Sequence, residues 1–400
     1  MSEYANLEHD YAKEGAAYSK AQMYSLAVDS FQKAVQANPN SEELYNELGM
    51  AYFYQNNFVQ AKEAFEKAIA CDEKSFKSYN NLAWIYHYDN NDDKAVEYFN
   101  EAIKLAPLNV EIINNCGEFY FDIGKFDEAL EHFLCCVSIN EANADIYLKI
   151  ARCYIEKNLY NDAIMYLQKA VSLKNDNPDF YSELGRIYYK KNDMENARIN
   201  FEKLIELEPE NEWAYSNLGN IYFYYYENLD VAYEYYKKAY ELNPFYCWAS
   251  YNLANMKIIY KNYEEAISLY ENAVKFAPQN TLFLNALART LCKLNDIDKA
   301  IEYYKKVIEI DSENEDGLIS LAQIYLEFKN DYKNAKNLFE KVIQINPKND
   351  SAYYGLAKLF FFDFDKKNAI INIDIAIKIN CENDKYKVLK NRIKDELTDE

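Results

Sequence analysis

The sequence predicts an all-α protein in which pairs of antiparallel helices recur along the chain as a solenoid. Glycine and proline, which usually mark loops, number only 8 and 7 among 400 residues. The intervals from Pro39 to Pro107 and from Pro107 to Pro209 are 68 and 102 residues, twice and three times 34. An alanine also recurs once in every such period. A fixed period of this length indicates one helical hairpin used repeatedly.

Alignment on this period divides residues 8–383 into eleven repeats. Their predicted bounds are 8–41, 42–75, 76–109, 110–143, 144–177, 178–211, 212–246, 247–280, 281–314, 315–349 and 350–383. The seventh and tenth repeats carry one extra residue, which we expect in the turns around 226–230 and 329–332, because surface turns accept insertions most easily. We interpret residues 1–7 as an N-terminal lead-in and residues 384–400 as a C-terminal capping helix.

Two columns of the alignment hold only small residues. The eighth position is glycine or alanine in every repeat, and the twentieth position is always alanine. The second column consists of Ala27, Ala61, Ala95, Ala129, Ala163, Ala197, Ala232, Ala266, Ala300, Ala335 and Ala369. Glycine inside a helix costs about 1 kcal/mol relative to alanine. Glycines such as Gly49 and Gly219 therefore indicate that two helices must approach closely.

Large residues occupy the remaining inward positions at helical spacing. Many of the 40 tyrosines fall in two columns, represented by Tyr45 and Tyr52 in the second repeat. We interpret both columns as core packing rather than as an aromatic cofactor site. The capping helix is expected to bury one side, formed by Tyr386, Leu389, Ile393 and Leu397.

These columns carry a family resemblance. Residues 42–75 resemble the tetratricopeptide repeat (TPR) motif through Tyr45, Leu48, Gly49, Tyr52, Ala61, Phe65 and Ala68. The resemblance covers residues 8–383 and implies a right-handed superhelix whose concave groove is lined mainly by the first helices. It also implies a protein that binds other proteins or peptides. Glu14, Lys257 and Leu291 depart from the motif at single positions.

Charge and composition exclude several other classes of function. The net charge of −21 repels phosphate backbones, so we expect no nucleic-acid partner. No apolar run approaches the roughly 20 residues of a membrane span, and the N-terminus lacks a secretory signal, so we expect a cytoplasmic protein without membrane insertion. The eight cysteines form no C-x-x-C pair, which argues against a metal site.

Catalytic motifs are also missing from the sequence. It contains no glycine-rich phosphate loop, no G-x-S-x-G elbow and no H-E-x-x-H pair. The repeats leave about 24 residues outside them, which is too few for a catalytic domain. We therefore predict neither enzymatic activity nor a cofactor.

The resemblance places certain first-helix positions in the groove, and these give the candidate partner-binding residues. An aromatic stretch contains Phe53, Tyr54, Trp84 and Tyr88. A second stretch, of amides and arginines, contains Arg152, Arg186, Asn217, Asn220, Asn252, Asn255, Asn285 and Arg289. An asparagine amide both donates and accepts hydrogen bonds, which suits an extended peptide backbone. These asparagines resemble those in the TPR region of O-linked N-acetylglucosamine transferase, but asparagine is abundant throughout this chain, so the row could also be compositional.

The sequence favours an acidic adaptor or scaffold that holds an extended segment of a partner protein. Position 5 of the repeats never holds a lysine, which argues against binding of a chaperone tail ending in EEVD. Two alternatives remain open. The chain could be a structural subunit that self-associates through Trp213, Trp248 and the 222–226 tyrosine run, or it could regulate a separately encoded enzyme. Its oligomeric state is not predicted.

Overall fold

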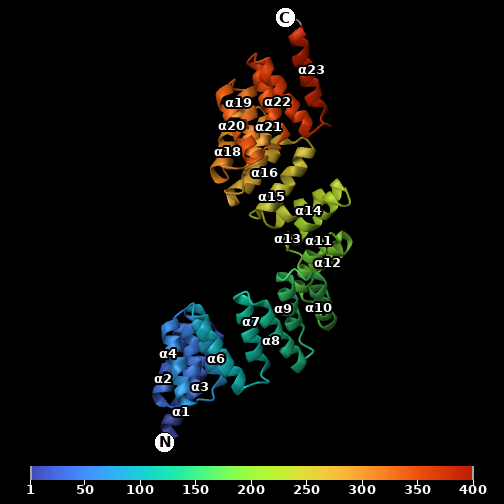
Figure 1. Ribbon diagram of the computed structural model, residues 1–400. Coiled ribbons are helices and arrows are strands. Elements are labelled where there is room, and N and C mark those ends of the chain that lie inside the picture. The colour runs from blue at the N-terminus through green and yellow to red at the C-terminus, as the bar shows by residue number, and fades with distance from the viewer. Residues whose placement is uncertain (1, 399–400) are drawn as a thin grey trace. The chain divides into compact units, whose positions relative to one another are not determined.

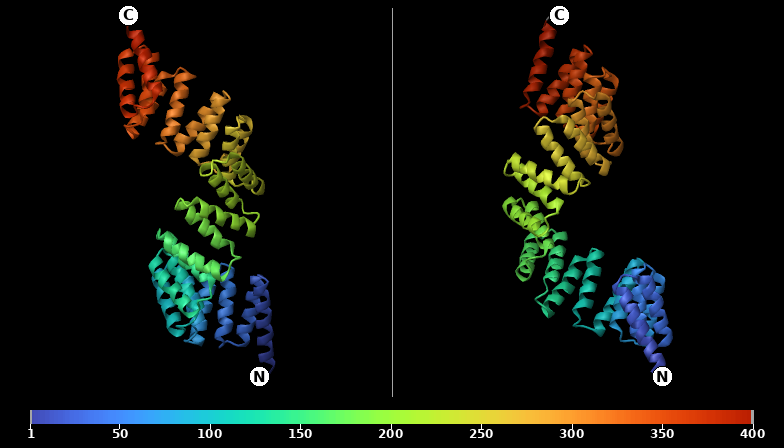
Figure 2. Two further views of the ribbon diagram at one scale, coloured as in Figure 1. Left: turned by 90° about the vertical axis from the view of Figure 1, so that its right-hand side faces the viewer. Right: turned by 180° about the vertical axis from the view of Figure 1, so that it is seen from behind.

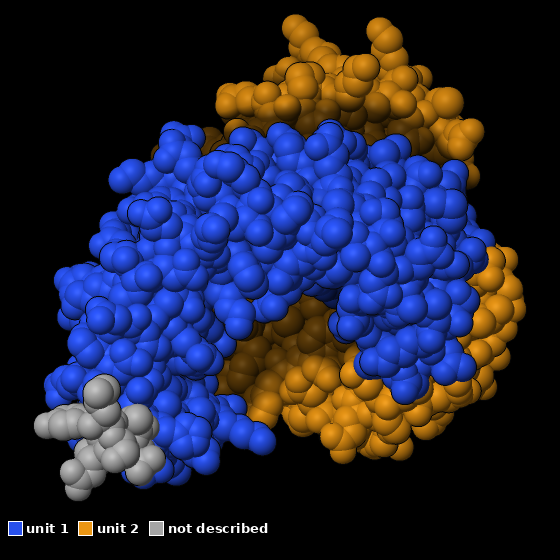
Figure 3. All heavy atoms as spheres, turned by 90° about the horizontal axis from the view of Figure 1, so that it is seen from below, with its two compact units in different colours: residues 1–193 blue, residues 194–400 orange. Residues whose placement is uncertain are grey.

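In the computed structural model, which describes residues 2–398 and the side chains of residues 8–395, every regular element is an α-helix (Figure 1). The described residues form 23 helices and no strand. The chain divides into two compact units, Met1–Asp193 and Met194–Glu400, which have separate colours in Figure 3. The sequence-based prediction of an all-α solenoid of helix pairs is confirmed.

The N-terminal unit contains the first eleven helices, which alternate between first and second helices of the repeats. They are α1 (Ser2–Lys20), α2 (Tyr24–Ala37), α3 (Glu42–Tyr54), α4 (Phe58–Cys71), α5 (Phe76–Tyr88), α6 (Asp92–Leu105), α7 (Val110–Asp122), α8 (Phe126–Ile139), α9 (Ala144–Glu156), α10 (Tyr160–Leu173) and α11 (Pro178–Lys190). Helix α1 begins six residues before the predicted start of the first repeat.

The C-terminal unit contains the remaining helices. They are α12 (Met194–Leu207), α13 (Glu212–Tyr224), α14 (Leu229–Leu242), α15 (Cys247–Ile259), α16 (Tyr263–Phe276), α17 (Thr281–Lys293), α18 (Ile297–Ile310), α19 (Glu315–Glu327), α20 (Tyr332–Ile345), α21 (Asp350–Phe362), α22 (Lys366–Ile379) and α23 (Asp384–Thr398). The connections from α13 to α14 and from α19 to α20 are one residue longer than the other turns within repeats. These are the turns in which the alignment places the extra residues.

Asparagine has a structural role in the turns inside the repeats. Each turn contains one residue with positive φ, between 51° and 75°. These residues are Gln22, Asn56, Asn90, Gly124, Asn158, Asn192, Glu227, Lys261, Asn295, Asn330 and Phe364. The left-handed region is unfavourable for most side chains and least so for glycine and asparagine. Part of the asparagine content is therefore explained by the backbone of the turns.

A second structural role of asparagine is to cap the first helices. Asn109 Oδ1 accepts hydrogen bonds from the N–H groups of Glu111 and Ile112 at the start of α7. Side-chain caps of this kind begin most first helices, at Ser41, Ser75, Asn109, Asn143, Asn177, Asn211, Asn280, Asn314 and Asn349. Each satisfies N–H groups that have no partner within the helix, and its loss would cost about 1 kcal/mol.

The small-residue columns lie where the two helices of a repeat meet. All eleven alanines of the twentieth position are fully buried, with 0% exposed surface. A Cβ added at Gly49 would lie 2.5 Å from the ring of Phe65, and one added at Gly117 would lie 2.6 Å from the ring of Phe133. Such distances are too short for a normal contact. The glycines therefore make room for an aromatic ring on the second helix, which confirms the predicted steric demand.

The first helices of successive repeats approach one another. Within the N-terminal unit α3 contacts α5 and α5 contacts α7, and within the C-terminal unit α13 contacts α15 and α19 contacts α21. Among the described residues, second helices of successive repeats make no contact of comparable extent. Figure 2 shows the helix pairs of each unit side by side. Because the first helices of successive repeats lie closer together than the second helices do, the first helices line the inner side of each unit's curvature.

Helix α23 covers the last repeat with one apolar side. Tyr386, Leu389 and Ile393 are 3%, 9% and 0% exposed, and they pack in one cluster with Ala357 and Phe361 of α21. The predicted fourth member of this side, Leu397, has a side chain that lies outside the described residues. A polar outer face on such a terminal helix stabilises the end of a repeat array against water.

Candidate partner-binding surface

The predicted asparagines of repeats 7 and 8 line two adjoining pockets on the inner face of the C-terminal unit. The first pocket, of about 500 Å³, contains Asn217, Asn220 and Asn252 and is formed by α13 and α15. The second pocket, of about 340 Å³, contains Asn252 and Asn255. Tyr224, Tyr251 and Asn252 belong to both, so the two pockets form one continuous surface, which we call the amide surface.

Aromatic side chains form the walls of the amide surface. Trp213 packs edge-on against Phe201 with ring centroids 5.3 Å apart, and Trp248 packs against Phe283 at 5.0 Å. Trp248 is 41% and Tyr224 is 71% exposed. Fixed aromatic walls around polar groups are typical of sites that bind side chains together with backbone.

Hydrogen bonds within and between the repeats hold each of these asparagines in place. Asn217 Nδ2 donates to the carbonyl oxygen of Trp213 at 2.8 Å. Asn252 Nδ2 donates to Ser216 Oγ at 3.2 Å and to Asn220 Oδ1 at 3.3 Å. The oxygens of Asn220 and Asn255 also accept hydrogen bonds from buried tyrosine hydroxyls. The amides are therefore fixed in orientation before any partner arrives.

Two of the three predicted arginines, Arg152 and Arg186, are paired with a carboxylate of the same chain. Arg152 Nε lies 3.3 Å from Glu183 Oε1, and Arg186 donates to the same carboxylate at 2.6 Å. Arg289 is exposed and faces the hydroxyl of Tyr304. Glu183 already neutralises part of the positive charge of Arg152 and Arg186, which weakens them as receptors for a partner's carboxylate.

Asn285 has a different position from the other predicted asparagines. It is only 7% exposed, and its Nδ2 donates to Asn314 Oδ1 at 3.2 Å. Asn314 caps the first helix of the next repeat by accepting a hydrogen bond from the N–H of Gly317. Asn285 therefore joins two repeats and is not open to a partner.

The predicted aromatic stretch forms a continuous row of rings in the N-terminal unit. Phe53 contacts Tyr54 at 5.7 Å and Tyr88 at 5.6 Å between ring centroids, and Tyr88 contacts Trp84 at 6.3 Å. Tyr54 and Tyr88 are 53% and 51% exposed. The structure thus brings all four predicted residues together as one partly exposed apolar surface, which we call the aromatic row.

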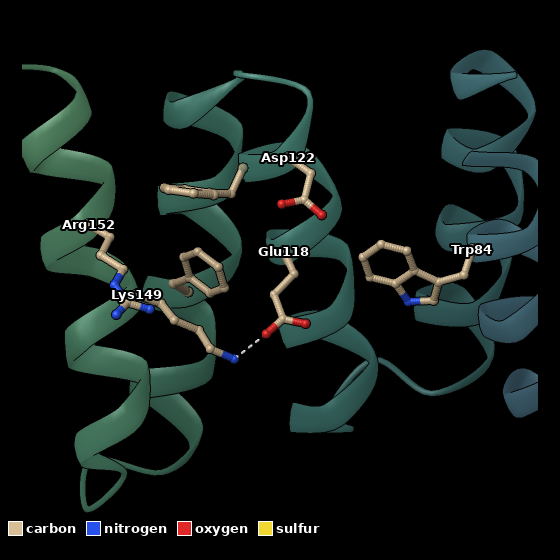
Figure 4. Close-up of a pocket in the computed structure, with 7 residues that line it drawn as sticks. Trp84, Glu118, Asp122, Lys149 and Arg152 are labelled. Atoms are coloured by element: carbon tan, nitrogen blue, oxygen red, sulfur yellow. Dashed lines mark hydrogen bonds and ion pairs between the residues drawn. The ribbon is translucent and has the colours of Figure 1, made fainter. Parts of the chain in front are cut away.

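A pocket of about 260 Å³ lies at the end of the aromatic row (Figure 4). Trp84 comes from α5, Glu118 and Asp122 from α7, and Lys149 and Arg152 from α9. Lys149 forms an ion pair with Glu118. Partial burial raises the pKa of Asp122, and the negative charge of Glu118 raises it further, whereas His87 lowers it. The pocket therefore has a charged floor beside an aromatic wall.

One cysteine thiol, that of Cys116, lies beside a histidine ring. Cys116 Sγ lies 3.5 Å from His132 Nε2. Burial raises the pKa of Cys116 to about 12 and lowers the pKa of His132. A thiol is nucleophilic only as its thiolate, so this buried pair is a packing contact at neutral pH.

Within the described part of the chain, no three His, Cys, Asp or Glu side chains come together as they would to hold a metal ion. No helix among these residues has both the length and the apolar composition needed to cross a membrane.

Sequence reasoning missed the two tyrosines that hold the asparagines. Tyr236 and Tyr270 occupy a ring position that is phenylalanine in most repeats, such as Phe65 and Phe99. A tyrosine in a buried column needs a partner for its hydroxyl. The presence of tyrosine in a column that is mostly phenylalanine was the sequence signal that could have indicated these two hydrogen bonds.

Comparison with family models finds tetratricopeptide repeats along the chain. Models described as TPR repeat or tetratricopeptide repeat match residues 43–107, 185–224, 257–304 and 316–349. A model described as regulator of microtubule dynamics protein 1-3 matches residues 122–183. No curated protein matches this chain.

Several solved structures are similar to this chain at low sequence identity. PilF of Pseudomonas aeruginosa is 20% identical over 51% of this chain and 92% of its own, with a TM-score of 0.44. Yeast Tom70 is 16% identical over 98% and 97%, with a TM-score of 0.41. YrrB, described as a TPR protein with an unusual peptide-binding site, is 23% identical over 49% and 97%, with a TM-score of 0.42.

The family matches recur at sites spread along the repeats, and every matched segment consists of the helix pairs described above. This chain belongs to the tetratricopeptide repeat family.

Proposed function

We propose that the protein is a non-catalytic adaptor that holds an extended segment of a partner protein on the amide surface. The observation that carries the proposal is the meeting of Asn217, Asn220, Asn252 and Asn255 in two adjoining pockets with aromatic walls. Amides supply both donors and acceptors to a peptide backbone, and the tryptophans provide apolar contact for its side chains.

Family membership supports the coarser part of this proposal. A solenoid of helix pairs creates an extended inner surface, and repeat proteins use such surfaces to bind other proteins. The aromatic row is a second contact surface in the same proposal, because Tyr54 and Tyr88 expose about half of their surface and exposed apolar patches usually mark contacts. We place the protein in the cytoplasm, since its eight cysteines are free thiols.

The proposal is tested by replacing Asn217, Asn220, Asn252 and Asn255 together with alanine. Partners are first identified by affinity purification and mass spectrometry with the wild-type protein, and the affinity of the tightest is then titrated. We expect the variant to bind at least about 100-fold more weakly, as expected for losing several hydrogen bonds of about 1 kcal/mol each. Far-UV circular dichroism should show unchanged helicity.

A matched control replaces three asparagines on second helices. Asn100 and Asn337 are exposed and Asn200 is half-buried, and they lie in α6, α20 and α12, so Asn→Ala there removes amides without touching the amide surface. The control should bind like the wild type. Equal affinity of the wild type and the four-asparagine variant would refute a role of the amide surface.

Light scattering separates the adaptor from the self-associating alternative. An adaptor of this kind is expected to have a molar mass that does not rise with protein concentration. If mass rises with concentration, and replacing the exposed Tyr224 and Tyr225 prevents the rise, the chain is instead a subunit of a homotypic assembly.

A further inference from the structure

The buried rings of repeats 7 and 8 carry hydroxyls that reach the amide surface. Tyr236 and Tyr270 are 3% and 2% exposed. Tyr236 Oη donates to Asn220 Oδ1 at 2.9 Å, and Tyr270 Oη donates to Asn255 Oδ1 at 2.5 Å. In both repeats the tyrosine is on the second helix and the asparagine on the first, so a core residue contacts a groove residue from behind.

These bonds fix which end of each amide faces outward. A phenolic hydroxyl has one proton to donate, and only the oxygen of an asparagine amide can accept it. Asn220 Oδ1 also accepts from Asn252 Nδ2 at 3.3 Å, which uses its second lone pair. No hydrogen bond within the described residues involves Nδ2 of Asn220 or of Asn255. Both nitrogens therefore keep their protons for a ligand.

The asparagines three residues earlier have the opposite orientation. Asn217 Nδ2 donates to the Trp213 carbonyl at 2.8 Å, and Asn252 Nδ2 donates to Ser216 Oγ at 3.2 Å. Their Oδ1 atoms take part in no hydrogen bond within the described residues. Each repeat therefore offers one acceptor and, three residues later, one donor.

We propose that Tyr236 and Tyr270 are positioning residues that orient the amide surface into an alternating series: acceptor at Asn217, donor at Asn220, acceptor at Asn252 and donor at Asn255. The ligand class is an extended peptide, whose backbone N–H and C=O groups alternate. It binds in the register that places an N–H group at each acceptor of the series and a C=O group at each donor. This inference rests on the proposed function and specifies how its site reads the ligand.

Comparison among the repeats supports the pairing of hydroxyl and amide. Where the equivalent ring is phenylalanine, the ninth position of the repeat holds no asparagine. The phenylalanine repeats have Ala16, Met50, Trp84, Glu118, Arg186 and Gln323 at that position. Asparagine occurs there only in repeats 7 and 8, together with Tyr236 and Tyr270. The third tyrosine of this column, Tyr304 of repeat 9, faces Arg289 at the ninth position. Packing needs only the ring, so each tyrosine hydroxyl of the column is matched by a hydrogen-bonding side chain at the ninth position.

The test uses a defined probe, the tightest peptide selected on the whole wild-type chain from a phage library of random dodecapeptides. Its affinity is titrated by fluorescence anisotropy. The double variant Tyr236→Phe and Tyr270→Phe should bind the probe about ten-fold or more weakly, because the amides lose their fixed orientation although no atom facing the probe is removed. Phenylalanine fits this position, as Phe65 and Phe339 show.

Tyr181→Phe is the matched control for losing a buried hydroxyl. Tyr181 is 8% exposed, and its hydroxyl donates to the Asn175 carbonyl at 2.9 Å in the N-terminal unit. This control should keep wild-type affinity for the probe. If it loses as much affinity as the double variant, the effect is general destabilisation and the positioning role is refuted.

A second pair of variants tests the orientation itself. Asn220→Asp keeps the oxygen that accepts from Tyr236 but has no N–H group to donate, so the probe should bind about ten-fold or more weakly. Asn217→Asp adds the same charge on the same helix and keeps an oxygen to accept from the probe, but it loses the donation to the Trp213 carbonyl, so its affinity should fall clearly less than that of Asn220→Asp. Equal losses, or a larger loss for Asn217→Asp, would overturn the proposed series.

The outcomes separate this inference from the proposed function. If alanine at all four asparagines abolishes probe binding while the tyrosine-to-phenylalanine variant binds normally, the amide surface is the site and the positioning role fails. If the four-alanine variant binds the probe normally, the proposed function of this surface fails as well.

Discussion

In repeats 2 and 7 a glycine of the first helix packs against an aromatic ring of the second helix, but the ring differs. An added Cβ at Gly49 would lie 2.5 Å from Phe65, and one at Gly219 would lie 2.5 Å from Tyr236. In repeat 2 the residue beside the glycine is Met50, which packs in the same apolar cluster as Phe65. In repeat 7 it is Asn220, which accepts the hydroxyl proton of Tyr236. The tyrosine hydroxyl in the core of repeat 7 is thus accompanied by a polar residue on the inner face, where repeat 2 has an apolar one.

The difference shows how a repeat can vary its surface without changing its fold. Glycine and ring are complementary in shape, and that requirement is met equally by phenylalanine and tyrosine. A buried hydroxyl, however, needs a hydrogen-bond partner, and a side chain one helix away can supply it. The choice of ring in the core therefore restricts which side chain can occupy the ninth position of the repeat, in the groove.

The largest expected effect comes from removing the ring in either repeat. Phe65→Ala and Tyr236→Ala should each lower the free energy of unfolding by about 3–5 kcal/mol, because each opens a cavity against a glycine that cannot fill it. Urea unfolding followed by circular dichroism measures the loss, and hydrogen exchange shows whether it is local to the repeat. A loss below about 1 kcal/mol in one repeat and not in the other would show that the packing is not equivalent.

Exchanging the chemistry of the two repeats should give a smaller effect. Phe65→Tyr buries a hydroxyl beside Met50 and should cost about 1–3 kcal/mol, because the hydroxyl lacks a partner. Adding Met50→Asn supplies that partner and should recover about 1 kcal/mol. A double-mutant cycle measures this coupling. A coupling near zero would mean that the geometry of repeat 7 cannot be transferred to repeat 2.

Most of the fold could be predicted from the sequence because its causes are periodic. Small residues at the eighth and twentieth positions and large residues at helical spacing are requirements of each repeat separately, so eleven copies of the pattern reinforce one another. The structure confirms the column of buried alanines and the close approach at Gly49.

The candidate site could be predicted only in outline, because asparagine has several roles that look alike in a sequence. Asn56 occupies the left-handed region of a turn, Asn109 caps a helix, and Asn285 joins two repeats. Which amide atom of Asn220 faces outward depends on Tyr236, sixteen residues later on another helix. That contact follows from tertiary packing, and no local pattern reveals it.

A smaller effect is expected when only the hydroxyl of repeat 7 is removed. Tyr236→Phe should lower the free energy of unfolding by about 1 kcal/mol, the usual net value of one buried hydrogen bond. Phe65→Leu, which removes no polar group, supplies the contrast for a change in ring packing. If Tyr236→Phe raises stability, the hydroxyl is a cost to the fold that its role at the amide surface must explain.

The smallest effect concerns alkaline pH, where the two kinds of ring differ because only tyrosine ionises. Burial raises the pKa of Tyr270 and of Tyr304 above the usual value of about 10. Above about pH 10 the unfolded chain loses these protons while the folded chain keeps them, so the unfolded state binds fewer protons and stability falls as pH rises. Burial also raises the pKa of a third tyrosine, Tyr246, to about 12, so the stability that its proton contributes is lost between about pH 10 and 12.

Tyr270→Phe removes one such proton and should make the loss of stability with pH less steep, by at most about 1.4 kcal/mol for each pH unit above about pH 10. Urea unfolding at a series of pH values measures the slope, and phenolate absorbance follows the ionisation. Phe65→Leu changes a core ring without changing any ionisable group, so its slope should equal that of the wild type. An unchanged slope in Tyr270→Phe would mean that Tyr270 ionises as readily in the folded chain as in the unfolded one, and its hydroxyl could not then be held by Asn255 as strongly as the 2.5 Å contact implies.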